Sequence, residues 1–330
     1  MKKNQRKNRD KQIVAYDDHR VKVNVSPAET DYINATWMKR PSTERDYDCA
    51  ILNQYLPISM MSFIVTQNPT KETVHSYLHM LSHNRIDFVL AFSDEFQSKD
   101  ENLGSVSKKV VNKKKINDYM AIEVWEVTTI KQGFYGGRDS HCLRFLCLNG
   151  LGLGMNISDE KIKKLLTAIT LIRKEIGTNR DSVNIVLQDD YSGSSGAAVF
   201  LALLEMLESI DDAITKPNIE PNRIKGEINV FNVVSELRKK RAKMIMNYEQ
   251  YQLLFKALVF YSKHKNEFDA ILKDKRRTRT SSEPNHEDED TVSYGSVIED
   301  PSTSNIHEDE EDSEIFREDS VPYVEQDLVG

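Results

Sequence analysis

Long hydrophobic runs are absent from this sequence, and cysteine is scarce. No stretch approaches the roughly 18 consecutive apolar residues that a membrane-spanning helix needs, so no span is expected. The basic N-terminus, residues 1–12, lacks the apolar centre of a signal peptide. The cysteines, Cys49, Cys142 and Cys147, have neither the spacing of a disulfide framework nor that of a metal site. We therefore expect a cytoplasmic protein, or the cytoplasmic part of a receptor whose membrane segment lies outside this chain.

Charge is unevenly distributed along the chain. Residues 281–330 contain 17 Asp and Glu against one Arg, a net charge of −16. Since the whole chain carries −7, the residues before this segment carry +9. The acidic segment is also rich in Ser, Thr and Pro and has little apolar periodicity, which is typical of disorder. We predict a folded domain over residues 1–272 and a disordered acidic tail over residues 273–330.

Apolar periodicity predicts both strands and helices within the first 272 residues. The predicted strands are 31–38, 63–67, 87–92, 120–127, 142–148 and 183–187. The predicted helices are 71–84, 158–176, 197–209, 228–240 and 247–270. We expect Ser158 to cap the second helix, because a Ser oxygen accepts hydrogen bonds from free amides at a helix start. This mixture favours a single-core α/β or α+β domain.

One strand-to-helix turn has the form of a functional site. Residues 183–208 predict a buried strand, a turn of small residues and an apolar helix, in the stretch VNIVLQDDYSGSSGAAVFLALLEMLE. Such turns often present a nucleophile or bind phosphate at the helix N-terminus. This turn instead begins with Asp189 and Asp190, whose negative charges would repel a phosphate. The sequence thus predicts the geometry of a catalytic turn without its chemistry.

Four motifs, in the same order, resemble those of the protein tyrosine phosphatase family. They are RKNRDKQIVAYDDHRVKV at residues 6–23, DYINATWM at 31–38, FIVTQNPTKETVHSYLHML at 63–81 and MIMNYEQYQLLFKAL at 244–258. The resemblance covers roughly residues 5–262. Within the family, the chain most resembles the second domains of receptor-type phosphatases, such as the second domain of the leukocyte common antigen. It implies a single α/β domain in which helices flank a central, twisted, mixed sheet.

The resemblance also identifies the positions where the family's chemistry would lie. The family's signature loop is His-Cys, five residues, Arg, then Thr or Ser followed by Gly. In this loop the cysteine thiolate attacks phosphorus, while the arginine binds the phosphate oxygens. Here Gln188 stands at the cysteine position and Ser194 at the arginine position. A Gln amide is not a nucleophile, and a Ser hydroxyl does not replace a guanidinium.

Three further functional positions of the family carry other residues. Gly150 stands at the position of the general-acid Asp, Asp10 at that of the substrate-stacking Tyr, and Met246 at that of the water-positioning Gln. Gln250, at a second Gln position, is retained. Losses at five positions in separate segments predict a catalytically inactive domain, a pseudophosphatase rather than an enzyme. The role that the resemblance implies is binding or regulation in phosphotyrosine signalling.

One alternative stays open, namely an active enzyme with altered chemistry at residues 188–196. It would be a phosphatase, or a serine hydrolase with Ser194 as its nucleophile. We expect no cofactor and no metal. The expected partners are proteins, among them an adjacent active phosphatase domain or other phosphotyrosine-signalling proteins. Nucleic acid is not expected, because the net charge is −7 and the basic runs lack interleaved aromatic residues.

Two groups of residues outside the turn are candidates for contact with partners or for modification. Five lysines of one predicted hairpin are candidates for docking an acidic partner: Lys108, Lys109, Lys113, Lys114 and Lys115. Tyr294 and Tyr323, in the acidic tail, are candidate phosphotyrosines. Phosphorylation would add negative charge and create a docking site for arginine.

A histidine stripe is the last candidate. His75, His79 and His83 repeat every four residues on one predicted helix, a spacing that can bind zinc. No acidic residue joins the series, and apolar residues between them form the buried face. We therefore expect these histidines to lie at the surface beside that face, without a metal.

Overall fold

The computed structural model describes the chain in stretches: 2–23, 30–39, 61–93, 99–130, 137–149, 151, 158–177, 182–215 and 229–273. The chain divides into two units, Met1–Arg279 and Thr280–Gly330, and every described residue belongs to the first. Of the predicted tail only Lys273 is described, so the predicted division of the chain after residue 272 stays a prediction. Tyr294 and Tyr323 lie outside the described residues.

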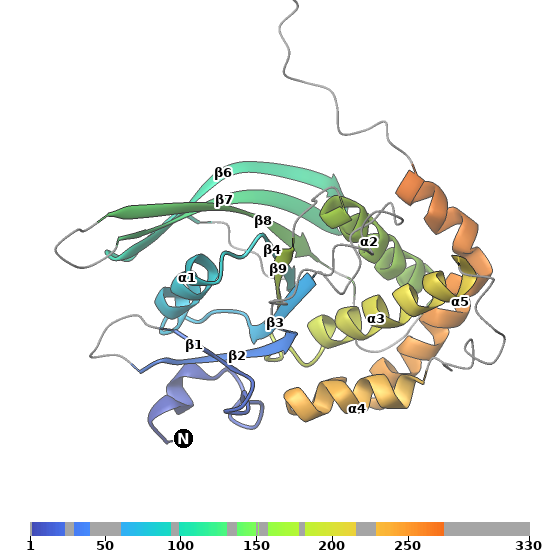
Figure 1. Ribbon diagram of the computed structural model, residues 1–330, viewed down its shortest axis with the longest axis horizontal. Coiled ribbons are helices and arrows are strands. Elements are labelled where there is room, and N and C mark those ends of the chain that lie inside the picture. Colours follow the sequence, from blue (N-terminus) through green and yellow to red (C-terminus); the bar gives the residue numbers. More distant parts are fainter. Residues whose placement is uncertain are drawn as a thin grey trace, which may run out of the picture. The chain divides into compact units, whose positions relative to one another are not determined.

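Among the described residues, nine strands form one mixed sheet in the order β1-β2-β3-β9-β4-β8-β7-β6-β5 (Figure 1). Their bounds are β1 Arg20–Lys22, β2 Tyr32–Lys39, β3 Met61–Gln67, β4 Phe88–Phe92, β5 Glu101–Asn102, β6 Val106–Asn117, β7 Met120–Ile130, β8 Arg138–Leu148 and β9 Val183–Asp189. The central strands β3, β9, β4 and β8 run parallel, and the flanking pairs are antiparallel. The predicted mixed sheet is confirmed.

The described residues also form five α-helices and one 3-10 helix. Their bounds are η1 Lys2–Lys7, α1 Val74–His83, α2 Asp159–Gly177, α3 Gly196–Thr215, α4 Val230–Lys240 and α5 Tyr248–Lys273. The five predicted helices and six predicted strands are all present, with their ends shifted. Ser158 caps α2 as predicted, since its Oγ accepts a hydrogen bond from the N–H of Lys161 at 3.3 Å. The predicted α/β fold with flanking helices is confirmed.

Different helices cover the two faces of the sheet, because successive residues of a strand point in opposite directions. In β9, Ile185 and Leu187 pack in a core with α2, α3, α4 and α5, whereas Val186 packs in a second core with α1. Figure 1 shows those four helices gathered on one side and α1 on the other, beneath the long strands β6, β7 and β8. Burial on both faces explains why the successive residues Ile185, Val186 and Leu187 are all apolar.

The carboxyl ends of the four parallel strands form a row. Asp189 of β9 is in register with Gln67 of β3 and Phe92 of β4, and Phe92 is in register with Leu148 of β8. The segments after these strands therefore meet at one edge of the sheet, where open α/β sheets bind their ligands. The 190–195 loop, which joins β9 to α3, begins at this edge.

Strands β1, β5 and β6 were not predicted individually. The second half of β6 is exposed, so it lacks the alternation of apolar and polar residues that identifies a half-buried strand. Pairing with β7 orders it instead, from Val106 opposite Thr129 to Asn117 opposite Met120. The lysine run thus lies on a hairpin, as predicted, and that hairpin consists of β6 and β7.

Candidate functional site

The side chain of Asp189 fills the 190–195 loop. Its Oδ1 accepts hydrogen bonds from the N–H groups of Tyr191 at 2.9 Å and Gly193 at 2.6 Å. Its Oδ2 accepts from the N–H groups of Ser195 at 3.0 Å and Ala197 at 3.2 Å. The last of these belongs to the first turn of α3, where amide donors have no partner within the helix. Four donors of a potential anion site are therefore bound to a carboxylate of the same chain.

Burial and hydrogen bonding act in opposite directions on this carboxyl group. Asp189 is 1% exposed, and this burial raises its pKa, while the four amide N–H groups oppose the rise. Amides at a helix N-terminus favour a negative charge, as they do in phosphate sites. The 190–195 loop thus holds its acidic group where related geometry would hold a bound anion.

Two residues with positive φ give the loop its curvature. Ser192 has φ 55° and Gly193 has φ 75°. A Cβ atom on Gly193 would lie 2.3 Å from Cγ1 of Val65 and 2.9 Å from the carbonyl oxygen of Thr66, so only glycine fits there. Tyr191, which stands where the resemblance to the phosphatase family implies a small residue or Gly, is 60% exposed and points out of the loop. Its bulk is therefore accommodated by solvent.

Arg241 contacts the 190–195 loop from outside. It was not predicted from the sequence as a site residue. This residue is fully buried, and its Nε and Nη2 donate to the carbonyl oxygen of Ser192 at 3.0 and 2.7 Å. Its Nη1 donates to Oγ1 of Thr36 at 2.6 Å, and Nη2 also donates to Oδ1 of Asn34 at 2.9 Å. Burial lowers the pKa of Arg241 to about 10, although the negative charge of Asp189 opposes this lowering. Arg241 therefore joins β2 to the 190–195 loop.

The sequence does contain a signal for Arg241. Val230, Val234 and Leu237 are the buried residues of α4, at intervals of four and three residues. Arg241 follows Leu237 by four residues and so continues the same helical stripe. Among the lysines and arginines of the run LRKKRAK, Arg241 lies closest to the centre of that stripe, which distinguishes it from those that face solvent.

Gln188, at the predicted cysteine position, points away from the 190–195 loop. It is 4% exposed, and its Oε1 accepts a hydrogen bond from the hydroxyl of Tyr77 in α1 at 2.5 Å. Burial raises the pKa of Tyr77, so this hydroxyl keeps its proton and remains a donor. Adjacent strand residues face opposite sides, and at this strand end the inward-facing residue is Asp189. The structure thus places Asp189 in the loop, and not its neighbour Gln188, which the family resemblance places at the cysteine position.

Ser194, at the predicted arginine position, is bound within the loop. It is fully buried, and its Oγ donates to the carbonyl oxygen of Tyr191 at 2.5 Å. The backbone N–H of Ser194 donates to the same oxygen at 3.1 Å. This hydroxyl therefore closes a turn and does not project to the surface.

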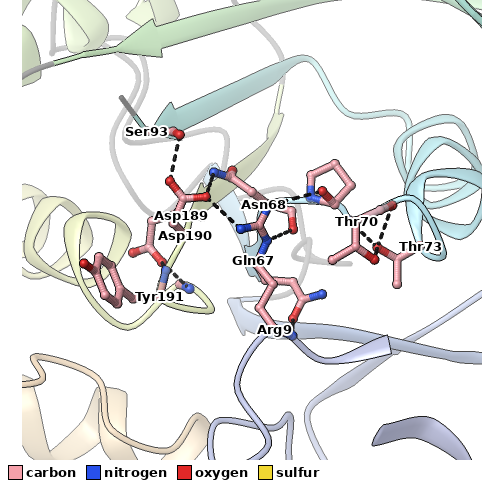
Figure 2. A network of polar contacts seen from close by, with 11 residues as sticks. Arg9, Gln67, Asn68, Thr70, Thr73, Ser93, Asp189, Asp190 and Tyr191 are labelled. Carbon is pink, nitrogen blue, oxygen red and sulfur yellow. Dashed lines mark hydrogen bonds and ion pairs between the residues drawn. The ribbon is translucent and has the colours of Figure 1, made fainter. Parts of the chain in front are cut away.

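A second polar network lies on the outer side of the loop, centred on Asp190 (Figure 2). Its Oδ1 accepts from Nδ2 of Asn68 at 2.8 Å and forms an ion pair with Nη1 of Arg9 at 3.1 Å. Its Oδ2 accepts from the hydroxyl of Ser93 at 2.8 Å. Arg9 also donates through Nε to the carbonyl oxygen of Asn68 at 2.8 Å. The network joins the N-terminal segment to the ends of β3, β4 and β9.

The other predicted site residues are spread around this edge. Asp10 is partly exposed, and its Oδ1 accepts from the N–H of Gln12 at 2.7 Å. Met246 is 39% exposed, and its N–H donates to Oε1 of Gln250 at 2.8 Å. Nε2 of Gln250 donates to Oγ of Ser195 at 2.8 Å, so this retained glutamine supports the start of α3. Gly150 lies outside the described residues.

The lysine hairpin is partly paired within the domain. Lys108 is 7% exposed, with Nζ 4.4 Å from the ring centroid of Trp125, and burial lowers its pKa. Lys113 forms an ion pair with Glu123 at 2.9 Å, and Lys115 forms one with Asp118 at 2.9 Å. Lys109 and Lys114 are exposed. Lys108 is therefore a packing residue, and the other four lysines form the exposed part of the predicted docking patch.

Membrane-spanning helices and larger metal-binding clusters are both absent from the described residues. None of their helices is long and apolar enough to cross a membrane. They also contain no group of three or more His, Cys, Asp or Glu residues that could hold a metal ion.

Replacing Gly193 by Ala tests the shape of the loop. The new Cβ would overlap Val65 in the positive-φ backbone, so we expect Gly193→Ala to lower the free energy of unfolding by at least about 3 kcal/mol. Gly104→Ala is the matched control, because Gly104 has φ 77° but nothing within 4 Å of its added Cβ. Gly104→Ala should lower the free energy of unfolding by only about 1 kcal/mol. Equal losses in urea denaturation would contradict the close approach.

Replacing Asp189 by Asn tests the internal carboxylate. The amide keeps one acceptor oxygen but turns an NH2 group toward two of the four loop donors, so we expect a loss of about 2–4 kcal/mol in stability. Asp17→Asn is the control, because the Asp17 side chain is 94% exposed. The measurement is the free energy of unfolding in urea. A loss no larger than that of Asp17→Asn would show that the loop does not depend on the carboxylate.

A family model and curated relatives match most of this chain. A family model described as protein-tyrosine phosphatase matches residues 4–135 and 155–260. Receptor-type tyrosine-protein phosphatase zeta is 23% identical over 276 residues in Rattus norvegicus and 25% identical over 277 residues in Homo sapiens. Each alignment covers 78% of this chain but 10% of the relative. The chain therefore spans about a tenth of the length of these relatives.

Solved structures show the same fold. The catalytic domain of human protein tyrosine phosphatase non-receptor type 18 matches with a TM-score of 0.58 and 18% identity, over 79% of this chain and 86% of that chain. PTPN18 in complex with HER2 phosphopeptides matches with a TM-score of 0.58 and 16% identity, over 78% and 88% of the two chains. The family model covers well over half of the sequence, and the chain belongs to the protein-tyrosine phosphatase family.

Proposed function

We propose that this chain is a catalytically inactive member of the family that serves as a binding or regulatory module in phosphotyrosine signalling. The observation that carries the proposal is the carboxylate of Asp189, which accepts four backbone N–H groups around the 190–195 loop. A phosphate would need these same donors and would also meet the negative charge already among them. The substrate position of the family is therefore filled by the protein itself.

The reactive groups are replaced as well. Gln188 offers an amide that is bound to Tyr77, so it supplies no thiolate. Ser194 offers no bidentate cation for phosphate oxygens. Two guanidinium groups contact the loop among the described residues, and both are already engaged. Arg9 is paired with Asp190 on the outer side of the loop, and Arg241 donates to the Ser192 carbonyl, to Thr36 and to Asn34 from a buried position. Nucleophilic attack and charge stabilisation both lack their groups.

The alternative of altered chemistry at residues 188–196 has weaker support. Its nucleophile would be Ser194, whose hydroxyl is buried and donates its proton to the carbonyl oxygen of Tyr191. An activated serine instead donates to a general base and faces the substrate. We therefore favour the inactive reading over a serine hydrolase or an unusual phosphatase.

Family membership and the filled loop both support the proposed binding role. PTPN18, a structural neighbour, is solved with HER2 phosphopeptides, whereas the loop of this chain is closed to phosphate in our proposal. We infer that its partners are cytoplasmic proteins recognised through other surfaces. An active phosphatase domain of a receptor is one such partner, by analogy with paired phosphatase domains, because the curated relatives are about ten times longer than the aligned region. Four exposed lysines of β6 are candidate contacts for an acidic partner.

Restoring the family's residues tests the loss of activity. The first revertant carries Gln188→Cys, Ser194→Arg, Gly150→Asp and Tyr191→Gly, and the second adds Asp189→Ser. We expect no turnover of a phosphotyrosine peptide by the wild type or the first revertant, because the carboxylate still fills the loop. The second revertant should exceed the first by at least about 100-fold, a typical effect of oxyanion donors.

The matched control for Asp189→Ser is Asp190→Ser in the same four-residue background. It removes a carboxylate of the outer network but leaves the loop filled, so it should stay as inactive as the first revertant. Wild-type turnover above the buffer blank would overturn the inactive assignment. Loss of that turnover in Ser194→Ala would support the alternative chemistry.

Binding to an active domain tests the regulatory half of the proposal. The chain is titrated calorimetrically into the active domain of a receptor-type tyrosine phosphatase. We expect a dissociation constant of about 10 μM or tighter, which corresponds to roughly −7 kcal/mol, and a changed kcat/KM for the active domain. Absence of both effects at about 100 μM protein would argue against regulation of such a domain.

A further inference from the structure

Two histidines of α1 point at a single atom. Nε2 of His75 lies 2.9 Å from Oγ of Ser105, and Nε2 of His79 lies 3.1 Å from the same oxygen. The two imidazole rings are 4.8 Å apart between centroids and inclined at 79°. Ser105 lies in the turn between β5 and β6, so the two rings converge between a helix and a turn. All three residues are half-buried.

Hydrogen bonding around Ser105 constrains the two rings. A serine hydroxyl has one proton, so it donates to one Nε2 and must accept from an N–H on the other. With both rings neutral, the two histidines are then in different tautomers. If both carried their proton on Nδ1, two Nε2 lone pairs would face the same point. A cation that accepts lone pairs would stabilise that second arrangement.

The sequence alone predicts no metal at this histidine stripe, but the convergence of the two rings changes that expectation. We propose that His75 and His79 form a two-histidine site for a divalent transition ion of the zinc, nickel or copper class. The helix supplies the spacing, because residues four apart lie on one face and two such imidazoles can bind one metal. Convergence of both Nε2 atoms on one oxygen supplies the orientation. Metal–nitrogen bonds of about 2.0–2.1 Å are shorter than the present contacts to oxygen, so the ion sits between the rings at the position that Ser105 now approaches.

The ligand chemistry selects the ion. Imidazole nitrogens suit zinc, nickel and copper, whereas calcium and magnesium require several oxygen ligands. The described residues contain no third His, Cys, Asp or Glu that would complete a closed structural site. Water molecules, and the Ser105 hydroxyl as a weak ligand, therefore complete the coordination. Such an open site binds reversibly, and it would fasten α1 to the β5–β6 turn.

His83 provides the matched control on the same helix. It follows His79 by four residues and is exposed, and it lies in the last turn of α1. A metal bound by helical spacing alone would use His79 and His83 as readily as His75 and His79. A metal bound by the convergent pair would not depend on His83.

Titration of the full chain without an affinity tag tests the site. After dialysis against a chelator, ZnCl2 and NiCl2 are titrated calorimetrically into the wild type and into His75→Gln, His79→Gln and His83→Gln. We expect one equivalent to bind with a dissociation constant of about 1–100 μM, weakened at least tenfold in the first two variants and unchanged in His83→Gln. Gln preserves a hydrogen bond to Ser105 but is a poor ligand. No binding at about 1 mM metal, or equal binding by all variants, would overturn the proposal.

A wild-type measurement covers the case in which a variant fails to fold. Nitrogen-15 NMR of histidine-labelled protein reports each imidazole separately during the ZnCl2 titration. We expect the nitrogen resonances of two imidazoles to shift, with the same dissociation constant that calorimetry gives. A folded His75→Gln or His79→Gln variant should lack one of these two resonances. In the wild type, nuclear Overhauser contacts between the carbon-bound protons of the shifted rings and the Hβ protons of Ser105 identify the pair without any variant. Shifts confined to other histidines would overturn the site.

Discussion

Four backbone amides that surround one buried carboxylate hold the end of β9 to the start of α3. Amide groups in a tight loop and in a first helical turn lack partners of their own, and a buried carboxyl group without donors costs several kcal/mol. Asp189 and the 190–195 loop satisfy each other's requirements. Arg241 completes the arrangement from behind, since it holds the Ser192 carbonyl and also reaches β2. The edge of the sheet depends on this pairing.

If the chain is inactive, as we propose, the pairing also explains how the fold can keep the form of a phosphate site without its reaction. In the family, the donors of this loop serve an anionic substrate and a thiolate. In the proposed account, the chain supplies the anion itself, so the curved backbone stays stable although the nucleophile and the guanidinium are replaced. Asp190 adds a second layer, because its ion pair with Arg9 joins the N-terminal segment to the same strand ends. In that account, the loop contributes to stability through Asp189 and does not bind a substrate.

The sequence predicted the secondary structure and the mixed sheet because both depend on local periodicity and on family motifs. The identity of the inward-facing residue was not predictable in the same way. Gln188 and Asp189 are neighbours, and only the pairing of β9 with β3 and β4 decides which of them faces the loop. Arg241 contacts residues about 200 positions earlier, so local pattern could suggest its burial but not its partners. The exposed half of β6 lacked periodicity and owes its order to β7.

Binding of a phosphate analogue by the wild-type chain tests the central claim most directly. Orthovanadate and a phosphotyrosine peptide are titrated into the folded protein while the amide resonances of Tyr191, Gly193, Ser195 and Ala197 are followed by NMR. If Asp189 fills the loop, these four resonances will not shift at millimolar ligand, and no heat of binding will be detected. Saturable shifts of the same four amides would show that the loop accepts a phosphate in place of the carboxylate, and would contradict the account.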